Sequence, residues 1–229
     1  MVVRVFGTDV HIGLGAIFLL MIFALFGSSF LSDPFSIAVF SLLALLCLFA
    51  HEFAHVLAGR IFGISCPRIS VWLFGMGAHL DSMGKNPKEM FVVSAVGPLT
   101  SFSLALFFVL ALGSVPIPLM LAQIFAALVF LNVILGIFNI LPLFPLDGGR
   151  VAHSIFWFFT KSKIKSAVYA VRLSKTLIVL LLAYLASGVI IAGVSPFSLL
   201  WPGFLAWLLW NMASAELQIA RSGKPPYDS

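Results

Sequence analysis

Charged residues are scarce in this chain. They make up only 9% of the 229 residues, whereas 62% of the residues are hydrophobic. Soluble globular domains carry about 25% charged residues. The chain therefore lacks the groups that would cover a water-exposed surface, which excludes an ordinary soluble domain and predicts that much of its surface faces lipid.

Cysteines are also few, and we find neither a polar linker nor a secretory signal. Cys47 and Cys66 are the two cysteines, too few for a disulfide framework, and we expect reduced thiols. We find no polar linker and no internal repeat, so we expect one domain over 1–229, with a flexible tail at 222–229. Asp9 and His11 interrupt the approach to the first apolar run, which argues against a secretory signal.

Long apolar runs are the main feature that is present. A bilayer core about 30 Å thick is crossed by roughly 20 apolar helical residues. The sequence predicts an all-α integral membrane protein with six transmembrane helices. The expected spans are 14–31, 35–58, 90–112, 118–141, 173–193 and 197–215.

The distribution of basic residues predicts the orientation. With the N-terminus inside, all 13 Lys and Arg residues fall on one side of the six-span arrangement. Lys and Arg accumulate on cytoplasmic loops, so we expect a multi-pass protein of the cell membrane with both termini cytosolic. Anionic lipid accounts for the net charge of +5. We expect no nucleic-acid partner, because the aromatic residues lie in the spans.

Two acidic residues stand where membrane segments rarely carry them. Glu52 lies within the second apolar run and Asp147 directly follows the fourth. Intramembrane ionisable residues are costly and indicate function by default. The partners of Glu52 are adjacent in the chain, since residues 51–55 read His-Glu-Phe-Ala-His.

Residues four apart lie on one helix face, so His51 and His55 can bind one ion. Glu52 can then reach a water on that ion, which is the arrangement of zinc peptidases. Two alternatives stay open, a polar cluster between helices and a proton path. The alternative function is an ion- or proton-coupled transporter that uses His51, Glu52, His55 and Asp147.

Asp147 is the expected third ligand, because zinc in hydrolases takes three protein ligands and a water. His51 and His55 precede Arg60 by nine and five residues, and Asp147 precedes Arg150 by three. If both arginines mark the cytosolic face, the three side chains lie at similar depth near that face.

The stretch before Asp147 supports this role. Pro142 and Pro145 cannot continue a helix, and non-helical backbone at membrane depth occurs where it is buried in protein or lines a wet cavity. Gly148 and Gly149 allow a turn or a close approach. The alternative is an exit loop in which Asp147 caps a helix that begins near Val151.

These motifs resemble those of the site-2 protease family of intramembrane zinc metalloproteases. The resemblance rests on residues 51–55, on Asn-Ile-Leu-Pro-Leu-Phe-Pro-Leu-Asp-Gly-Gly-Arg at 139–150, and on Gly-Pro at 97–98. The chain resembles a minimal form without a PDZ domain or a C-terminal regulatory domain.

The resemblance implies an endopeptidase with one Zn²⁺ per chain, which acts in regulated intramembrane proteolysis. It implies Glu52 as catalytic base and Asn139 as a hydrogen-bond donor to the substrate or intermediate. The implied partners are single-span membrane proteins and the lipid bilayer. The oligomeric state is left open.

Smaller features complete the expectations. Segment 64–80 predicts short strands at the membrane surface whose free edge pairs with substrate, with an interfacial loop as the alternative. We expect His11, His79 and His153 not to be ligands. Gly97-Pro98 is interpreted as a kink or a close packing contact, and Cys47 as packing around the site.

Overall fold

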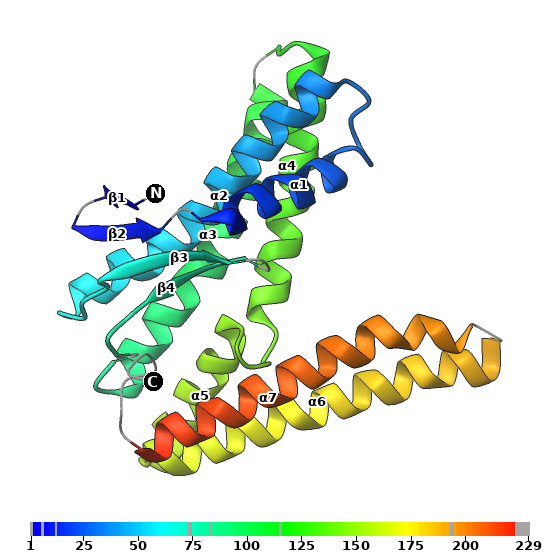
Figure 1. Ribbon diagram of the computed structural model, residues 1–229. Coiled ribbons are helices and arrows are strands. Elements are labelled where there is room, and N and C mark those ends of the chain that lie inside the picture. Colours follow the sequence, from blue (N-terminus) through cyan, green and yellow to red (C-terminus); the bar gives the residue numbers. More distant parts are fainter. Residues whose placement is uncertain are drawn as a thin grey trace. The chain divides into compact units, whose positions relative to one another are not determined.

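The computed structural model describes most of the chain as helices with one small sheet (Figure 1). The described residues are 2–5, 7–11, 13–72, 75–82, 84–114, 116–192 and 195–222. The expected tail therefore lies, except for Ser222, outside the described residues. The chain forms two compact units, one of Met1–Gly84 with Ala95–Asn139 and the other of Lys85–Ser94 with Ile140–Ser229. The expectation of a single domain stays a prediction.

The first unit contains long apolar helices. They are α1 (Leu14–Gly27), α2 (Pro34–Ile61), α3 (Pro87–Ser114, from Ala95 onward) and α4 (Leu119–Ile140, up to Asn139). Asp33 caps α2, because its carboxylate accepts the Ser36 N–H at 2.7 Å. Buried residues of all four helices, among them Phe23, Phe40, Phe108 and Leu128, form one apolar core.

A small sheet packs on α2 in the same unit. Its strands are β1 (Val2–Val5), β2 (Thr8–His11), β3 (Arg68–Trp72) and β4 (Gly75–His79), in the order β1-β2-β3-β4. The pairs β1–β2 and β3–β4 are antiparallel, and β2–β3 is parallel. The prediction of strands within 64–80 is confirmed, and β4 is an edge strand of the described sheet.

Thr8 anchors this sheet to the C-terminal end of α2. Its hydroxyl donates to the Cys66 carbonyl at 3.0 Å and accepts from the Arg60 guanidinium at 2.8 Å. Thr8 is fully buried, so both hydrogen bonds satisfy groups that have left water. The anchor connects the sheet to the helix that carries His51 and His55.

The second unit is built on a helical hairpin. Helices α6 (Lys163–Ala192) and α7 (Leu200–Ser222) run side by side, with the 3₁₀ turn η1 (Pro196–Leu199) before α7 (Figure 1). Helix α5 (Asp147–Thr160) packs on α6. Arg150 of α5 pairs with Glu216 of α7 at 3.2 Å, which links the start of α5 to the hairpin.

Four of the described helices are long and apolar enough to cross a membrane. They are α2, α3, α4 and residues 163–189 of α6, which contain or overlap the predicted spans 35–58, 90–112, 118–141 and 173–193. Helix α1 is apolar but has only 14 residues, fewer than the roughly 20 that a spanning helix uses. Six spans are therefore not confirmed, because α1 and α7, which match the first and sixth predictions, are not among these four.

Candidate metal centre

Two histidines lie together on α2, as their spacing predicts. His51 and His55 are 1% and 6% exposed, and their ring centroids lie 5.3 Å apart at an interplanar angle of 73°. The uninterrupted helix places them one turn apart on one face. Burial of two imidazoles costs free energy unless their nitrogens bind a hydrogen-bond partner or a metal. The neighbours of each nitrogen therefore indicate the role of the ring.

The Nε2 atoms of both rings converge beside Gly97 of α3. A Cβ placed on Gly97 would lie 2.7 Å from Nε2 of His51 and closer still to Nε2 of His55. Any side chain larger than hydrogen would thus collide with both imidazole rings. The interpretation of Gly97 as a close packing contact is confirmed, but its contact with the two imidazoles was not foreseen from the sequence.

The other ring nitrogen of His51 has a buried partner. Nδ1 lies 2.9 Å from the hydroxyl oxygen of Ser101, which is fully buried. Sequence reasoning missed Ser101. The available signal was its position, because it follows Gly97 by four residues and so shares its face of α3.

Glu52 is held by the sheet. Its Oε2 accepts the backbone N–H of Ala78 in β4 at 3.0 Å. Ala78 lies opposite Ile69 of β3. Because the Ala78 N–H donates to Glu52, this N–H lies on the edge of β4 that faces away from β3. Nothing in the sequence identifies Ala78 as the residue that contacts Glu52.

Asp147, the predicted third ligand, is the first residue of α5 in the second unit. Leu146 occupies the N-cap position, so the helix begins at Asp147 rather than near Val151. An acidic residue in the first turn is stabilised by the helix dipole.

Gly148 and Gly149 allow the preceding loop to pack on this helix start. A Cβ on Gly148 would overlap the backbone oxygens of Ile140 and Leu141, and one on Gly149 would lie 2.7 Å from the Phe144 nitrogen. The expected close backbone approach is confirmed, and it fixes where α5 begins.

Ser174 of α6 anchors the same loop from 30 residues away. Its hydroxyl accepts the Phe144 N–H at 3.2 Å, and its proton is shared between two carbonyl oxygens, that of Pro142 at 3.1 Å and that of Ala170 within α6 at 3.0 Å. Phe144 is buried in the core of this unit with Ala170, Val171 and Ala213. These contacts hold the loop that ends at Asp147.

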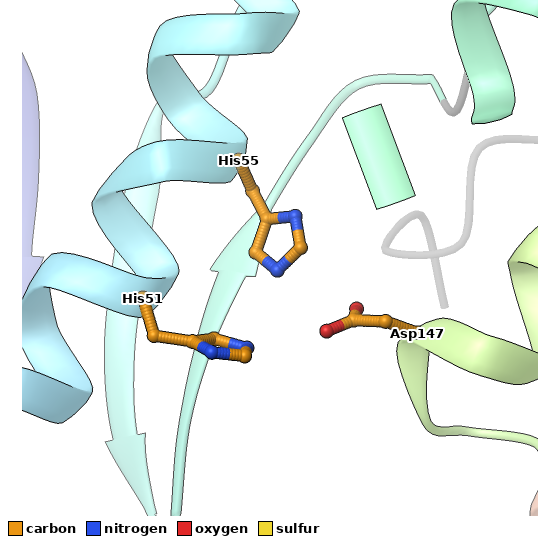
Figure 2. Close-up of side chains that lie close together, drawn as sticks. All are labelled: His51, His55 and Asp147. Atoms are coloured by element: carbon orange, nitrogen blue, oxygen red, sulfur yellow. The ribbon is translucent and has the colours of Figure 1, made fainter. Parts of the chain in front are cut away.

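His51, His55 and Asp147 form a group that could hold a metal ion. One ligand atom from each of His51, His55 and Asp147 can be chosen so that all three atoms lie within 4.8 Å of one another (Figure 2). Two imidazole nitrogens and one carboxylate oxygen are a ligand set that zinc uses in hydrolases. The residues present therefore fit a zinc ion.

Asn139, the proposed donor, lies in the last turn of α4. Its side-chain amide donates to the Leu135 carbonyl oxygen within the helix at 3.0 Å. This bond does not identify a role toward substrate, and the role of Asn139 stays a prediction.

Two of the remaining histidines occupy structural positions. His153 is buried, and its Nε2 lies 3.1 Å from the Lys163 carbonyl oxygen. Burial lowers its pKa, against the opposing effect of that backbone hydrogen bond. His11 lies in β2, exposed, in register with Ser70. His79 ends β4, and its side chain lies outside the described residues.

Both cysteines are free thiols, as predicted. Cys47 belongs to the apolar core of the first unit, one turn before His51. Burial raises the pKa of the Cys66 thiol to about 11, so this thiol is protonated and unreactive near neutral pH.

Known proteins resemble this chain in sequence. The model of Peptidase family M50 matches residues 117–183. Rip3 of Mycobacterium tuberculosis is 32% identical over 183 residues, which are 77% of this chain and 45% of Rip3. The zinc metalloprotease MJ0392 of Methanocaldococcus jannaschii is 29% identical over 185 residues, 79% of this chain and 53% of that protein. The chain thus spans about half the length of the curated relatives that it matches.

A solved structure resembles it in fold. The site-2 protease from Methanocaldococcus jannaschii matches with a TM-score of 0.61 over 95% of this chain and 94% of that one, at 22% identity. This likeness shows the fold, and with the four long apolar helices it identifies a multi-pass membrane protein. The chain belongs to peptidase family M50, the family of the site-2 proteases.

Proposed function

We propose that this protein is a zinc metalloprotease that hydrolyses peptide bonds in the transmembrane segments of membrane proteins. His51, His55 and Asp147 hold one zinc ion per chain. The observation that carries the proposal is the convergence of their three ligand atoms within 4.8 Å. The family membership supports the same chemistry.

Glu52 is the general base in this proposal. A zinc ion held there would lower the pKa of a bound water to about 7 and polarise the scissile carbonyl. The Glu52 carboxylate would accept a proton from the attacking water and return it to the leaving amine. The Ala78 N–H fixes the orientation of the carboxylate through Oε2. Asn139 donates a hydrogen bond to the substrate or the intermediate.

The substrate segment binds in extended form along the free edge of β4. A peptide bond inside a transmembrane helix is hydrogen-bonded and shielded, so the substrate has to unwind before it is cut. Strand addition supplies backbone partners to the unwound segment. The Ala78 N–H on this edge is already bound by Glu52, so a substrate strand that pairs with the other groups of the edge lies next to the base.

Met76 offers a test of strand addition. Alternation along an antiparallel strand puts its N–H on the same free edge as that of Ala78. Met76→Pro removes one edge donor, and Met76→Ala is the control for its side chain. We expect Met76→Pro to raise KM for a membrane substrate well beyond the effect of Met76→Ala, and equal kinetics of the two variants would exclude pairing there.

The remaining proposals concern substrates and orientation. Single-span membrane proteins are the substrates in regulated intramembrane proteolysis. The one-sided distribution of the basic residues supports cytosolic termini and an active site near the cytosolic face. Thiol labelling of single-cysteine variants from either side of oriented vesicles tests this orientation.

Cleavage by purified protein tests the function. Wild type and Glu52→Gln are incubated in detergent with a panel of single-span proteins, and cleavage and bound zinc are both measured. Glu52→Gln should keep zinc and lose roughly 10²- to 10⁴-fold in turnover. Glu89→Gln is the control, because Glu89 is partly exposed and caps α3 through the Lys85 N–H.

Two results would contradict the proposal. Wild-type turnover in Glu52→Gln would remove Glu52 from the mechanism. Ion flux in proteoliposomes that persists in Glu52→Asp, without any cleavage, would favour the transporter alternative.

A further inference from the structure

One face of α3 is fitted to the two imidazoles of α2. Gly97 and Ser101 lie four residues apart on this face. Gly97 leaves room beside Nε2 of His51 and Nε2 of His55, where a Cβ would collide with both rings. Ser101 approaches His51 from the other side of its ring, with its hydroxyl oxygen 2.9 Å from Nδ1. The two nitrogens of His51 thus have different surroundings.

If a metal binds Nε2 of His51, this arrangement is compatible with one form of the ring. A neutral imidazole carries one N–H and one lone pair. When Nδ1–H donates to the Ser101 oxygen, the lone pair is on Nε2, which is the nitrogen that faces Gly97. Histidines that bind a metal almost always donate their other N–H to an oxygen, and this bond fixes the tautomer and the ring orientation.

Burial makes the bond consequential. Ser101 is fully buried and His51 is 1% exposed, so the surrounding dielectric constant is low and the hydrogen bond is strong. The contact joins two helices, since His51 belongs to α2 and Ser101 to α3. Ser101 is therefore not a routine helix serine that bonds only within its own turn.

We propose that Ser101 is a positioning residue for the metal ligand His51. Its hydroxyl accepts Nδ1–H, holds the Nε2 lone pair toward the metal position, and prevents the ring from flipping. The inference rests on the proposed function only in taking His51 as a ligand, and it assigns Ser101 no contact with metal or substrate.

Zinc affinity tests this role without any cleavage assay. The dissociation constant for zinc is measured on the full-length chain in detergent by competition with a chelator. Ser101→Ala is expected to bind zinc 10- to 100-fold more weakly, the usual cost of losing such a partner. Ser101→Thr keeps the hydroxyl and should bind at least several-fold more tightly than Ser101→Ala.

Ser103 is the matched control on the same helix. It is exposed, and its hydroxyl donates to the Leu99 carbonyl within α3 at 2.8 Å. Ser103→Ala should bind zinc as tightly as the wild type does. The thermal midpoint of the metal-free protein is measured for each variant, because a purely structural serine would change that midpoint and leave zinc affinity alone.

Three outcomes would overturn the inference. Ser101→Ala with wild-type zinc affinity would show that the hydroxyl does not position His51. Equal losses in Ser101→Ala and Ser101→Thr would assign the effect to packing. Wild-type affinity in His51→Ala would overturn the proposed metal site itself and distinguishes that failure from a failure of Ser101 alone.

Discussion

The two stretches that supply the proposed zinc ligands are built in different ways. His51 and His55 lie within the continuous helix α2, so the helical repeat alone puts them on one face. Asp147 follows a break between two helices, and its position depends on backbone packing at Gly148 and on the hydroxyl of Ser174. A ligand pair on a helix is encoded locally, whereas a ligand in a loop needs distant residues.

This difference predicts which substitutions each of the two stretches tolerates. Around the histidines, the critical neighbour is a glycine, Gly97, whose missing side chain leaves room for the two imidazole rings. Around Asp147, the critical neighbours hold the backbone itself. Substitutions in the first set should affect metal binding more than stability, and those in the second set should affect stability first.

Among substitutions near His51 and His55, Gly97→Ala is expected to have the largest effect on zinc binding. Its methyl group would collide with the Nε2 atoms of His51 and His55 and displace the two rings. We expect zinc binding to be abolished, with a stability cost of about 1–3 kcal/mol from overpacking. Metal analysis and thermal unfolding measure the two effects separately.

Gly113→Ala is the control for that change, since a Cβ on Gly113 of α3 would meet nothing within 4 Å. It should keep wild-type zinc content. A Gly97→Ala protein that also keeps its zinc would show that the two rings do not aim at a common ion.

Among substitutions near Asp147, Gly148→Ala should have the largest effect on stability. Its Cβ would overlap the backbone oxygens of Ile140 and Leu141, which cannot rotate away as a flexible side chain could. We expect a loss of at least about 1–3 kcal/mol in the free energy of unfolding. Denaturation in mixed micelles measures it, with Gly203→Ala of α7 as control because a Cβ there is unobstructed.

Ser174→Ala should act in the same direction but more weakly. It leaves the N–H of the buried Phe144 without its hydroxyl acceptor, which costs about 1–3 kcal/mol. Ser187→Ala on the same helix is the control, because Ser187 is only partly buried and its hydroxyl donates to the Tyr184 carbonyl within α6. Equal stability of the two variants would mean that Ser174 does not hold the loop.

The smallest expected effect is on pH dependence. Burial lowers the pKa of His153 below its ordinary value of 6.5, so the unfolded chain binds this proton more readily than the folded one does. Stability should therefore decline as pH falls below about 6.5, until the pH drops under the folded pKa. His153→Gln should show a shallower acid decline in the thermal midpoint, and an unchanged slope would contradict this cause.

The sequence predicted the parts of the site that follow from local rules. The spacing of His51 and His55, the break at Pro142 and Pro145, and the close backbone approach at Gly148 could all be inferred from residue types and intervals. These features depend on helix geometry and on what proline and glycine allow.

Other features depend on contacts between distant segments. The contacts of Ser101 with His51 and of Ala78 with Glu52 span 50 and 26 residues, and no periodicity reveals them. Helix α1 shows a related limit: the predicted span 14–31 is apolar throughout most of its length, but the helix ends at Gly27. The composition of this segment indicated that it is apolar, but it did not indicate the residue at which the helix ends.

Zinc content measured across three proteins tests the central proposal most directly. Wild type, His51→Ala and Asp147→Ala are purified in parallel, and bound zinc per chain and its dissociation constant are determined. If one ion is held jointly, the wild type carries one zinc, and each variant loses most of its affinity. Wild-type affinity in Asp147→Ala would contradict the account, because the imidazole pair would then bind metal without the carboxylate.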